Sequence, residues 1–212
     1  MSVDVIVWTC AQYSFLIPKF VTYWQRSFTL PYRLTYVVAG TNRVQVPRNC
    51  NRIVTHFVTM QDNGMAANIL DYLDYRKSDD PFLMLMDDHI VFDACPDLIE
   101  RALNYIYISD VGCVRLVPWP GPTVNVNGEF GEIDKSLEYA ISLQASFWKP
   151  DTFRRVLERT WNPWEIELNG SVKARQLSER FIGCTQCAIN YKDYMMRGKP
   201  RAEHAQWVDA HL

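Results

Sequence analysis

Three adjacent polar residues, Asp87, Asp88 and His89, follow the apolar run at positions 82–86 and precede a second apolar stretch. Five consecutive apolar residues are typical of a strand that is buried on both faces. Such a strand delivers the three polar side chains at its carboxyl end, where open α/β sheets bind their ligands. Because crowded, desolvated carboxylates need a nearby cation, the triplet indicates a divalent metal carried by a phosphate.

A second group of acidic side chains, Glu165 and Glu167, lies within residues 162–171. Pro163 is suited to the first position of a helix, so Glu165 is expected in the opening turn, where the helix dipole stabilises a carboxylate that acts as a base. Glu167 lies two residues further along the helix and points in another direction. Only one of the two is expected to face a given site, and the sequence leaves open which one.

Length and charge limit the classes of function. A chain of 212 residues with 48% hydrophobic residues is long enough for one well-filled core, so a single domain is expected. The formal net charge of −2 excludes a generally basic nucleic-acid-binding surface. Binding to phosphates must therefore be local or occur through a metal.

Cysteine use and hydropathy indicate the compartment. The 6 cysteines are scattered through apolar segments, which is typical of reduced thiols in a cytoplasmic protein. Residues 184–187 match the CxxC pattern, but no second pair has the spacing of a zinc site. No signal sequence precedes the first expected strand, and no apolar stretch reaches the roughly 18 residues of a membrane span. The sequence therefore predicts a cytoplasmic protein without a transmembrane segment.

The order of apolar segments predicts the fold class. Strands are expected at 3–8, 33–39, 52–58, 82–86, 111–117 and 139–148, and helices at 13–28, 65–75, 96–107 and 151–158, the last capped by Asp151. This order predicts an α/β domain with a mostly parallel central sheet flanked by helices. Residues 118–131, with Trp119 among prolines, are expected to form a lid loop that takes part in binding.

Two further segments carry polar residues. Residues 61–64, which include Asp62, supply turn and helix-cap chemistry. The segment that starts at residue 190 is locally basic, and its side chains Arg197 and Lys199 are suited to close over a diphosphate.

These features together resemble a small glycosyltransferase of the GT-A type. The resemblance rests on the first strand, the helix at 65–75 that leads into 82–86, the Asp87-Asp88-His89 triplet, the run 164–167 and the closing segment 191–199. It implies a single Rossmann-like domain over residues 1–212. Residues 1–117 would form the half that binds the nucleotide sugar, and residues 118–212 the acceptor side with the lid loop and the basic tail.

The resemblance also implies an activity: transfer of a sugar from a nucleoside-diphosphate sugar, with a UDP-sugar expected, to an acceptor hydroxyl with inversion. In that fold a DxD or DxH motif holds the metal on the donor diphosphate, and Asp87-Asp88-His89 matches it. Mn²⁺, or Mg²⁺, is the implied metal. The implied site residues are Asp87, His89 and His204 for the metal, Thr9, Cys10, Asp62, Asp88, Trp119, Arg197 and Lys199 for the donor, and Glu165 or Glu167 as catalytic base.

The acceptor stays open between two classes. One is a glycan or lipid-linked saccharide. The other is a 5-hydroxymethylpyrimidine in phage DNA, because compact glycosyltransferases of this size occur in phage DNA modification; the protein would then work in the cytoplasm of the bacterial host. Arg43, Arg48 and Arg52 offer a local track for DNA phosphates.

Two other functions are considered. A nucleotidyltransferase of GT-A-like fold usually has a glycine-rich loop after its first strand, and residues 9–14 contain no glycine. A non-catalytic carbohydrate- or nucleotide-binding module would use tryptophans as stacking platforms, but it has no need of the acidic triplet.

Overall fold

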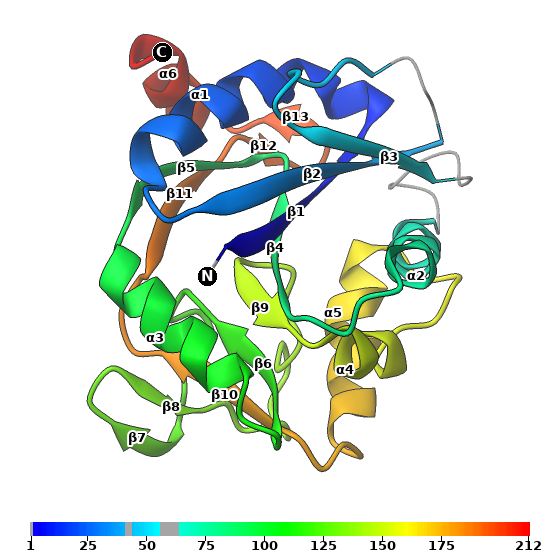
Figure 1. Cartoon of the computed structure of the whole chain (residues 1–212), viewed down its shortest axis with the longest axis vertical. Coiled ribbons are helices and arrows are strands. Elements are labelled where there is room, and N and C mark those ends of the chain that lie inside the picture. The colour runs from blue at the N-terminus through cyan, green and yellow to red at the C-terminus, as the bar shows by residue number, and fades with distance from the viewer. Residues whose placement is uncertain (1, 41–43, 56–63) are drawn as a thin grey trace.

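The computed structural model describes residues 2–40, 44–55 and 64–212. Within these residues, nine strands form one sheet in the order β3-β2-β1-β4-β9-β6-β10-β8-β7 (Figure 1). The strands are β1 (Val3–Cys10), β2 (Tyr32–Ala39), β3 (Asn51–Thr55), β4 (Phe82–Met86), β6 (Val111–Arg115), β7 (Val124–Asn127), β8 (Phe130–Glu132), β9 (Ser146–Trp148) and β10 (Arg180–Cys184).

Most strands of this sheet point in one direction. Strands β3, β2, β1 and β4 are parallel neighbours, as are β6 and β10, whereas β9 and β8 run antiparallel to the strands beside them. Two short antiparallel ladders accompany the sheet: β5 (His89–Ala94) with β11 (Ile189–Asp193), and β12 (Met195–Met196) with β13 (Lys199–Pro200). The predicted α/β class with a mostly parallel central sheet is therefore confirmed.

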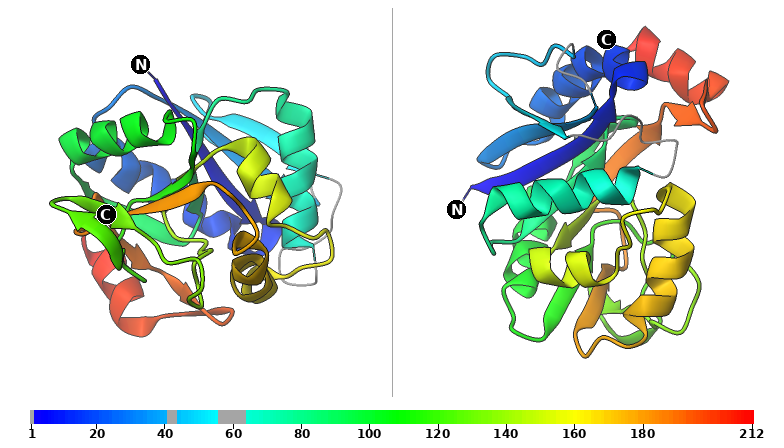
Figure 2. Two further views of the ribbon diagram at one scale, coloured as in Figure 1. Left: turned by 90° about the horizontal axis from the view of Figure 1, so that it is seen from below. Right: turned by 90° about the vertical axis from the view of Figure 1, so that its right-hand side faces the viewer.

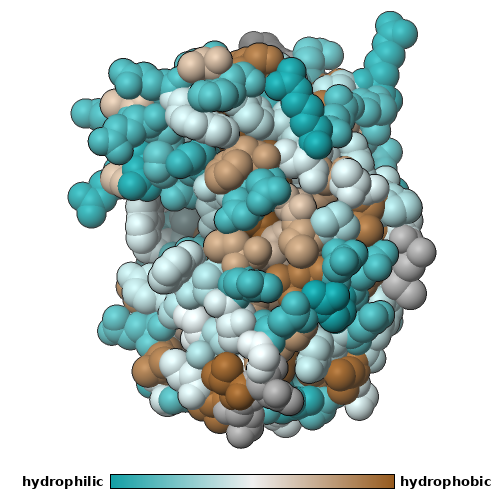
Figure 3. All heavy atoms as spheres, turned by 90° about the vertical axis from the view of Figure 1, so that its left-hand side faces the viewer, coloured by the Kyte–Doolittle hydropathy of each residue, from teal (hydrophilic) through white to brown (hydrophobic). Residues whose placement is uncertain are grey.

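Helices cover both faces of the sheet (Figures 1 and 2). They are the 3₁₀ helix η1 (Ala11–Leu16) and the α-helices α1 (Ile17–Ser27), α2 (Met65–Arg76), α3 (Pro96–Ile106), α4 (Pro150–Arg155), α5 (Pro163–Ala174) and α6 (Ala202–Ala210). None of the helices in the described part of the chain has the length and apolar character needed to cross a bilayer. Figure 3 shows one face of the molecule, on which hydrophilic residues surround a central area of more apolar ones.

The sheet separates two hydrophobic cores because alternate side chains of each strand point to opposite faces. Along β1, Val5 and Val7 pack with α1 and α3, whereas Ile6 and Trp8 pack with α2 and α5. All four side chains are completely buried. With both faces covered, the strand reads as an almost continuous apolar run, which is why the sequence pattern predicted it.

Several segments differ from the sequence prediction. The helix expected at 13–28 starts as the 3₁₀ helix η1 and continues as α1, which ends at Ser27. The strand expected at 139–148 covers only residues 146–148, because side chains rather than a strand ladder bind the backbone before it: Ser171 Oγ accepts from the N–H of Ile141 at 2.9 Å, and Arg115 donates to the carbonyl of Ala140 at 2.8 Å. The segment expected as a loop at 118–131 contains β7 and β8, which form a hairpin around Gly128 (φ 65°) and join the sheet edge.

Helix starts follow local chemistry. Pro96 and Pro163 occupy first-turn positions of α3 and α5, as the sequence predicted. The expected cap at Asp151 is wrong: Lys149 precedes α4 and makes no side-chain cap, and Asp151 lies inside the first turn because Pro150 already starts the helix. The strand predicted at 52–58 is β3, which starts at Asn51 and is described as far as residue 55.

Candidate functional site

Five of the residues predicted to do chemistry, Asp87, Asp88, His89, Glu167 and Arg197, gather beside the carboxyl ends of β1 and β4. The two strands pair in parallel, with Trp8 beside Met86, so both end at the same edge of the sheet. A cavity of about 700 Å³ opens there. Its lining combines acidic, basic and aromatic side chains with apolar ones: Gln12, Tyr13, Met86, Asp87, Asp88, His89, Leu143, Pro163, Trp164, Glu167, Met195, Arg197 and Gly198.

Asp87 is the most deeply buried acid of this cavity. Its side chain accepts a hydrogen bond of 2.5 Å from Thr9 Oγ1, and its backbone N–H donates to the carbonyl of Trp8. Burial raises the pKa of Asp87 well above its ordinary value and the charge of Asp88 raises it further, although the Thr9 hydrogen bond acts in the opposite direction. Thr9 and Cys10, predicted to contact the donor, are both buried and do not line the cavity.

Asp88 and His89 form the more accessible part of the triplet. Burial raises the pKa of Asp88, the neighbouring His89 lowers it, and Asp193 raises it. The His89 ring stacks on Tyr191 with 4.3 Å between ring centroids, and its Nε2 lies 3.8 Å from a carboxylate oxygen of Asp193. His89 also begins strand β5, so its place is fixed by the pairing of β5 with β11 as well as by the turn after β4.

Glu167 is held by a dedicated set of hydrogen-bond donors. Its Oε1 accepts from the backbone N–H of Leu143 at 2.9 Å and from Ser142 Oγ at 3.1 Å. Its Oε2 accepts no hydrogen bond from the described residues, so one oxygen is anchored and the other is available. The donating segment is itself bound by Arg115, which donates to the carbonyls of Tyr139 and Ala140.

Glu165 has a different role. Its carboxylate accepts from the backbone N–H of Asn162 at 2.9 Å, while the Asn162 side chain accepts from the Glu165 N–H at 3.0 Å. This reciprocal pair is a capping box that closes the start of α5. Of the two candidate bases, the structure places Glu167 in the cavity wall and Glu165 at the helix cap.

A tight hairpin brings the basic tail to the cavity. Strands β12 and β13 are joined by Arg197 (φ 50°) and Gly198 (φ 78°), both in the left-handed region. Arginine rarely adopts this conformation, and strained residues of this kind cluster at functional sites. Arg197 lines the cavity, whereas the exposed Lys199 does not. The hairpin is tied to the triplet because the N–H of Tyr194 donates to the carbonyl of Asp88 at 2.8 Å.

The remaining predicted site residues lie elsewhere. His204 Nδ1 is 3.1 Å from the carbonyl oxygen of Asp193, the residue that pairs with His89 across the β5–β11 ladder. His204 itself does not line the cavity. Trp119 is 66% exposed and does not line the cavity. Asp62 lies outside the described residues.

The donor groups around the cavity can be compared with those that a divalent cation needs. Among the described residues, no three His, Cys, Asp or Glu side chains are grouped so that they alone hold a metal ion. However, the buried Nδ1 of His89 has no hydrogen-bond partner there, and neither carboxylate of the triplet forms an ion pair with Lys or Arg in that part of the chain. Buried carboxylates without a cation fit a metal with one or two protein ligands, whose other ligands are substrate phosphates.

Sequence reasoning missed several residues of the cavity. Gln12 and Tyr13 line it in place of Thr9 and Cys10; both belong to η1, which follows directly on β1. Asp193 lies across the β5–β11 ladder from His89. Its long-range pairing leaves no local signal in the sequence.

No protein-family model and no curated protein sequence matches the chain. Among solved structures, the chain is similar to a mannosyltransferase from Pyrobaculum calidifontis in complex with GDP-Man and Mn²⁺, with a TM-score of 0.54 and 14% identity over 99% of this chain and 63% of that one. It is also similar to a mycobacterial protein, with a TM-score of 0.55 and 11% identity over 98% of this chain and 71% of that one. At sequence identities this low, the structural similarity shows a shared fold alone. The chain spans under two thirds of the length of the mannosyltransferase.

Proposed function

We propose that this protein is a metal-dependent glycosyltransferase that moves a sugar from a nucleoside-diphosphate sugar, a UDP-sugar in the first instance, to an acceptor hydroxyl with inversion. The observation that carries the proposal is the single cavity that unites Asp88, His89, Arg197 and Glu167 at the carboxyl edge of the sheet. The similar fold of a mannosyltransferase that binds GDP-Man and Mn²⁺ supports it, and GDP-sugars are therefore tested beside UDP-sugars.

The donor diphosphate is assigned to the triplet side of the cavity. Asp88 and His89, with Asp87 behind them, would hold Mn²⁺ or Mg²⁺ jointly with the diphosphate. Such a cation stabilises the negative charge of the leaving group. Arg197 faces the same cavity from the tail hairpin and supplies a second positive charge for the phosphate oxygens.

The acceptor hydroxyl is assigned to the Glu167 side. Attack on the anomeric carbon requires removal of the hydroxyl proton as the bond to the diphosphate breaks. Glu167 is suited to take that proton on Oε2, because Leu143 and Ser142 fix Oε1 and thereby orient the carboxylate. Trp164, 57% exposed at the rim, offers an aromatic face to a sugar ring.

The acceptor class and the location are parts of the same proposal. The acceptor is a glycan or lipid-linked saccharide, or else a hydroxymethylated base of phage DNA; retention on DNA at low salt and its loss at high salt would identify the second class. A cytoplasmic location is proposed because all 6 cysteines are free thiols.

The decisive experiment measures release of nucleoside diphosphate from a panel of sugar nucleotides with Mn²⁺, with and without EDTA. We expect turnover with one donor and its loss in EDTA. Asp88→Asn and Asp87→Ala should each lower kcat/KM at least 100-fold, on the order of what loss of a phosphate-binding cation costs. Unchanged turnover in both variants would refute the assignment of the triplet.

Two further readouts separate the alternatives. Saturable sugar binding without turnover would indicate a non-catalytic binding module with Trp164 as its platform, and release of pyrophosphate from a nucleoside triphosphate would indicate a nucleotidyltransferase. Analysis of the product anomer by NMR tests inversion. Retained configuration would exclude Glu167 as the base of a single displacement.

A further inference from the structure

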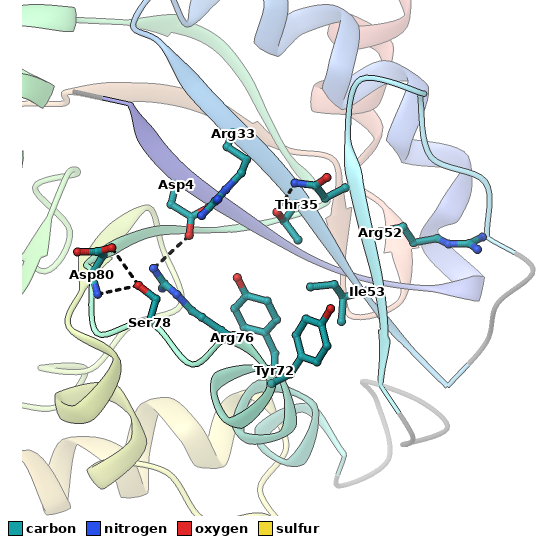
Figure 4. A pocket seen from close by; sticks show the side chains of 11 residues that line it. Asp4, Arg33, Thr35, Arg52, Ile53, Tyr72, Arg76, Ser78 and Asp80 are labelled. Carbon is teal, nitrogen blue, oxygen red and sulfur yellow. Dashed lines mark hydrogen bonds and ion pairs between the residues drawn. The ribbon is translucent and has the colours of Figure 1, made fainter.

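A second cavity, of about 490 Å³, opens at the opposite end of the same strands (Figure 4). It lies where β1, β2 and β3 begin and where α2 ends, whereas the candidate active site lies where β1 and β4 end. Asp4, Arg33 and Asn51 contribute from the three strands, and Tyr72 and Arg76 from the helix. Its volume falls in the range typical of small-molecule sites.

The position of these polar residues in the sheet is unusual. In β1, Ile6 and Trp8 point into the core under α2, so Asp4 points to the same side. In β2, Val37 points into that core, and Arg33 and Thr35 share its side of the strand. On the side that faces α2, each of these two strands therefore changes from polar to apolar side chains where the cavity meets the core.

Asp4 links two arginines inside the cavity. Its Oδ1 accepts from Arg33 Nε at 3.1 Å, and its Oδ2 lies 3.1 Å from Arg76 Nη2. Both carboxylate oxygens are thus occupied, and two guanidinium groups share one carboxylate. The three side chains together carry one positive charge that is not balanced within the group. Asp80, at the exposed rim, has its carboxylate directed to Ser78 Oγ at 2.9 Å.

Arg76 is the residue that points to a ligand. Its side chain is only 4% exposed, and its guanidinium lies over the ring of Phe82, 5.1 Å from the ring centroid. Nη2 contacts Asp4, but Nε and Nη1 have no hydrogen-bond partner among the described residues. Buried donors without acceptors cost free energy, so an oxygen-bearing group that reaches Nε or Nη1 would stabilise this end of the cavity.

We propose that this cavity binds the oxyanion of a small molecule, a phosphate or carboxylate group, between Arg33 and Arg76. Arg33 is 65% exposed and presents the remainder of its guanidinium at the entrance, while Arg76 closes the inner end (Figure 4). Paired guanidinium groups match the geometry of such oxyanions. Tyr75, 67% exposed at the rim, provides an aromatic surface for the rest of the molecule.

The test is a titration with inorganic phosphate at constant ionic strength, in which the Nε–H NMR signals of the arginines are monitored. We expect saturable shifts of the Arg33 and Arg76 signals with a Kd in the millimolar range. Arg33→Gln should weaken binding about tenfold, since it removes one charge-assisted hydrogen bond. This variant alters an exposed side chain, and so the fold is retained; Arg76→Lys provides a second test that keeps a cation beside Asp4.

Two matched controls locate the effect. Arg101→Gln changes an exposed arginine of α3 that pairs with Glu129 and does not line this cavity, so phosphate binding should be unaltered. Arg197→Gln removes the arginine of the candidate active site and should also leave it unaltered, which makes this proposal independent of the proposed function. A parallel titration with acetate distinguishes a carboxylate site from a phosphate site.

Three results would overturn the proposal. The first is the absence of saturable shifts with either anion. The second is wild-type affinity in both Arg33→Gln and Arg76→Lys. The third is loss of binding in Arg197→Gln, which would place the phosphate at the candidate active site instead.

Discussion

The two cavities lie at opposite ends of the same strands and hold opposite kinds of unbalanced charge. At the carboxyl ends, Asp87 and Asp88 are buried together without a Lys or Arg partner among the described residues. At the amino ends, Arg33 and Arg76 share the single carboxylate of Asp4. Between the two cavities, the strand side chains that pack under α2 are apolar. The sheet therefore has an apolar core and carries its polar residues at the strand ends. The carboxyl ends are suited to a cationic ligand and the amino ends to an anionic one.

The largest expected effect concerns the two glutamates of α5. Glu167→Gln should lower kcat by about 10²–10⁴-fold, because it removes the proton acceptor yet keeps an oxygen for the N–H of Leu143. Steady-state kinetics with the identified donor measure this, and KM for the donor should change little. Glu165→Gln is the matched control: it should keep activity within a few-fold, since Gln also serves in a capping box. A larger loss of kcat in Glu165→Gln would reverse the assignment of the base.

A comparison of the two buried arginines comes next. Arg115 is completely buried and donates to the carbonyls of Pro120, Tyr139 and Ala140, whereas Arg76 has only Asp4. Arg115→Met should lower the free energy of unfolding by about 3 kcal/mol or more, because three carbonyls lose their donor and the segment that orients Glu167 is released. Urea unfolding measures the loss.

Arg76→Met should cost less, about 1–2 kcal/mol, because Met retains the packing on Phe82 and removes the unpartnered Nε and Nη1. Arg115 leaves only its Nε without a hydrogen-bond partner among the described residues, whereas Arg76 leaves both Nε and Nη1. Equal losses in Arg76→Met and Arg115→Met would mean that Arg76 stabilises the fold as much as Arg115 does, and would weaken the proposed oxyanion site.

The same substitution, Asp→Asn, should have opposite effects at the two ends of the sheet. Asp4→Asn should destabilise the protein by about 2 kcal/mol, since it leaves Arg76 buried without a counter-ion. Asp87→Asn should stabilise it by about 1 kcal/mol at pH 7 while it lowers activity, because a desolvated charge disappears and Thr9 can still donate.

The stabilisation by Asp87→Asn should depend on pH in a defined direction. Burial raises the pKa of Asp87 in the folded state, so its ionisation opposes folding as the pH rises above the unfolded value of about 3.9. The advantage of the variant should therefore be present at pH 7 and vanish below about pH 4, where the carboxyl group is neutral in both states. An advantage that persists at pH 3 would show that packing rather than charge is responsible.

The fold was predictable where local pattern and burial agree. The apolar run 82–86 has the composition of a buried strand, and the strand predicted there is confirmed as β4. The cavity was only partly predictable, because Arg115 and Asp193 act through partners that are distant in sequence. Residues 139–145 read as a strand, yet their backbone is bound by Arg115, Ser171 and Glu167, and no local propensity reports such side-chain contacts.

The smallest expected effect concerns the charge that the tail hairpin brings to the carboxyl-end cavity. Asn tolerates the left-handed conformation of Arg197 better than Arg does, so Arg197→Asn should raise the free energy of unfolding by about 0.5 kcal/mol. The same variant should raise the donor KM several-fold, because the cavity loses its arginine. Lys199→Ala, in the same hairpin but outside the cavity lining, should change neither quantity. A higher KM in Lys199→Ala would show that the tail closes further over the donor than the hairpin does here, whereas an unchanged KM in Arg197→Asn would remove Arg197 from the donor site.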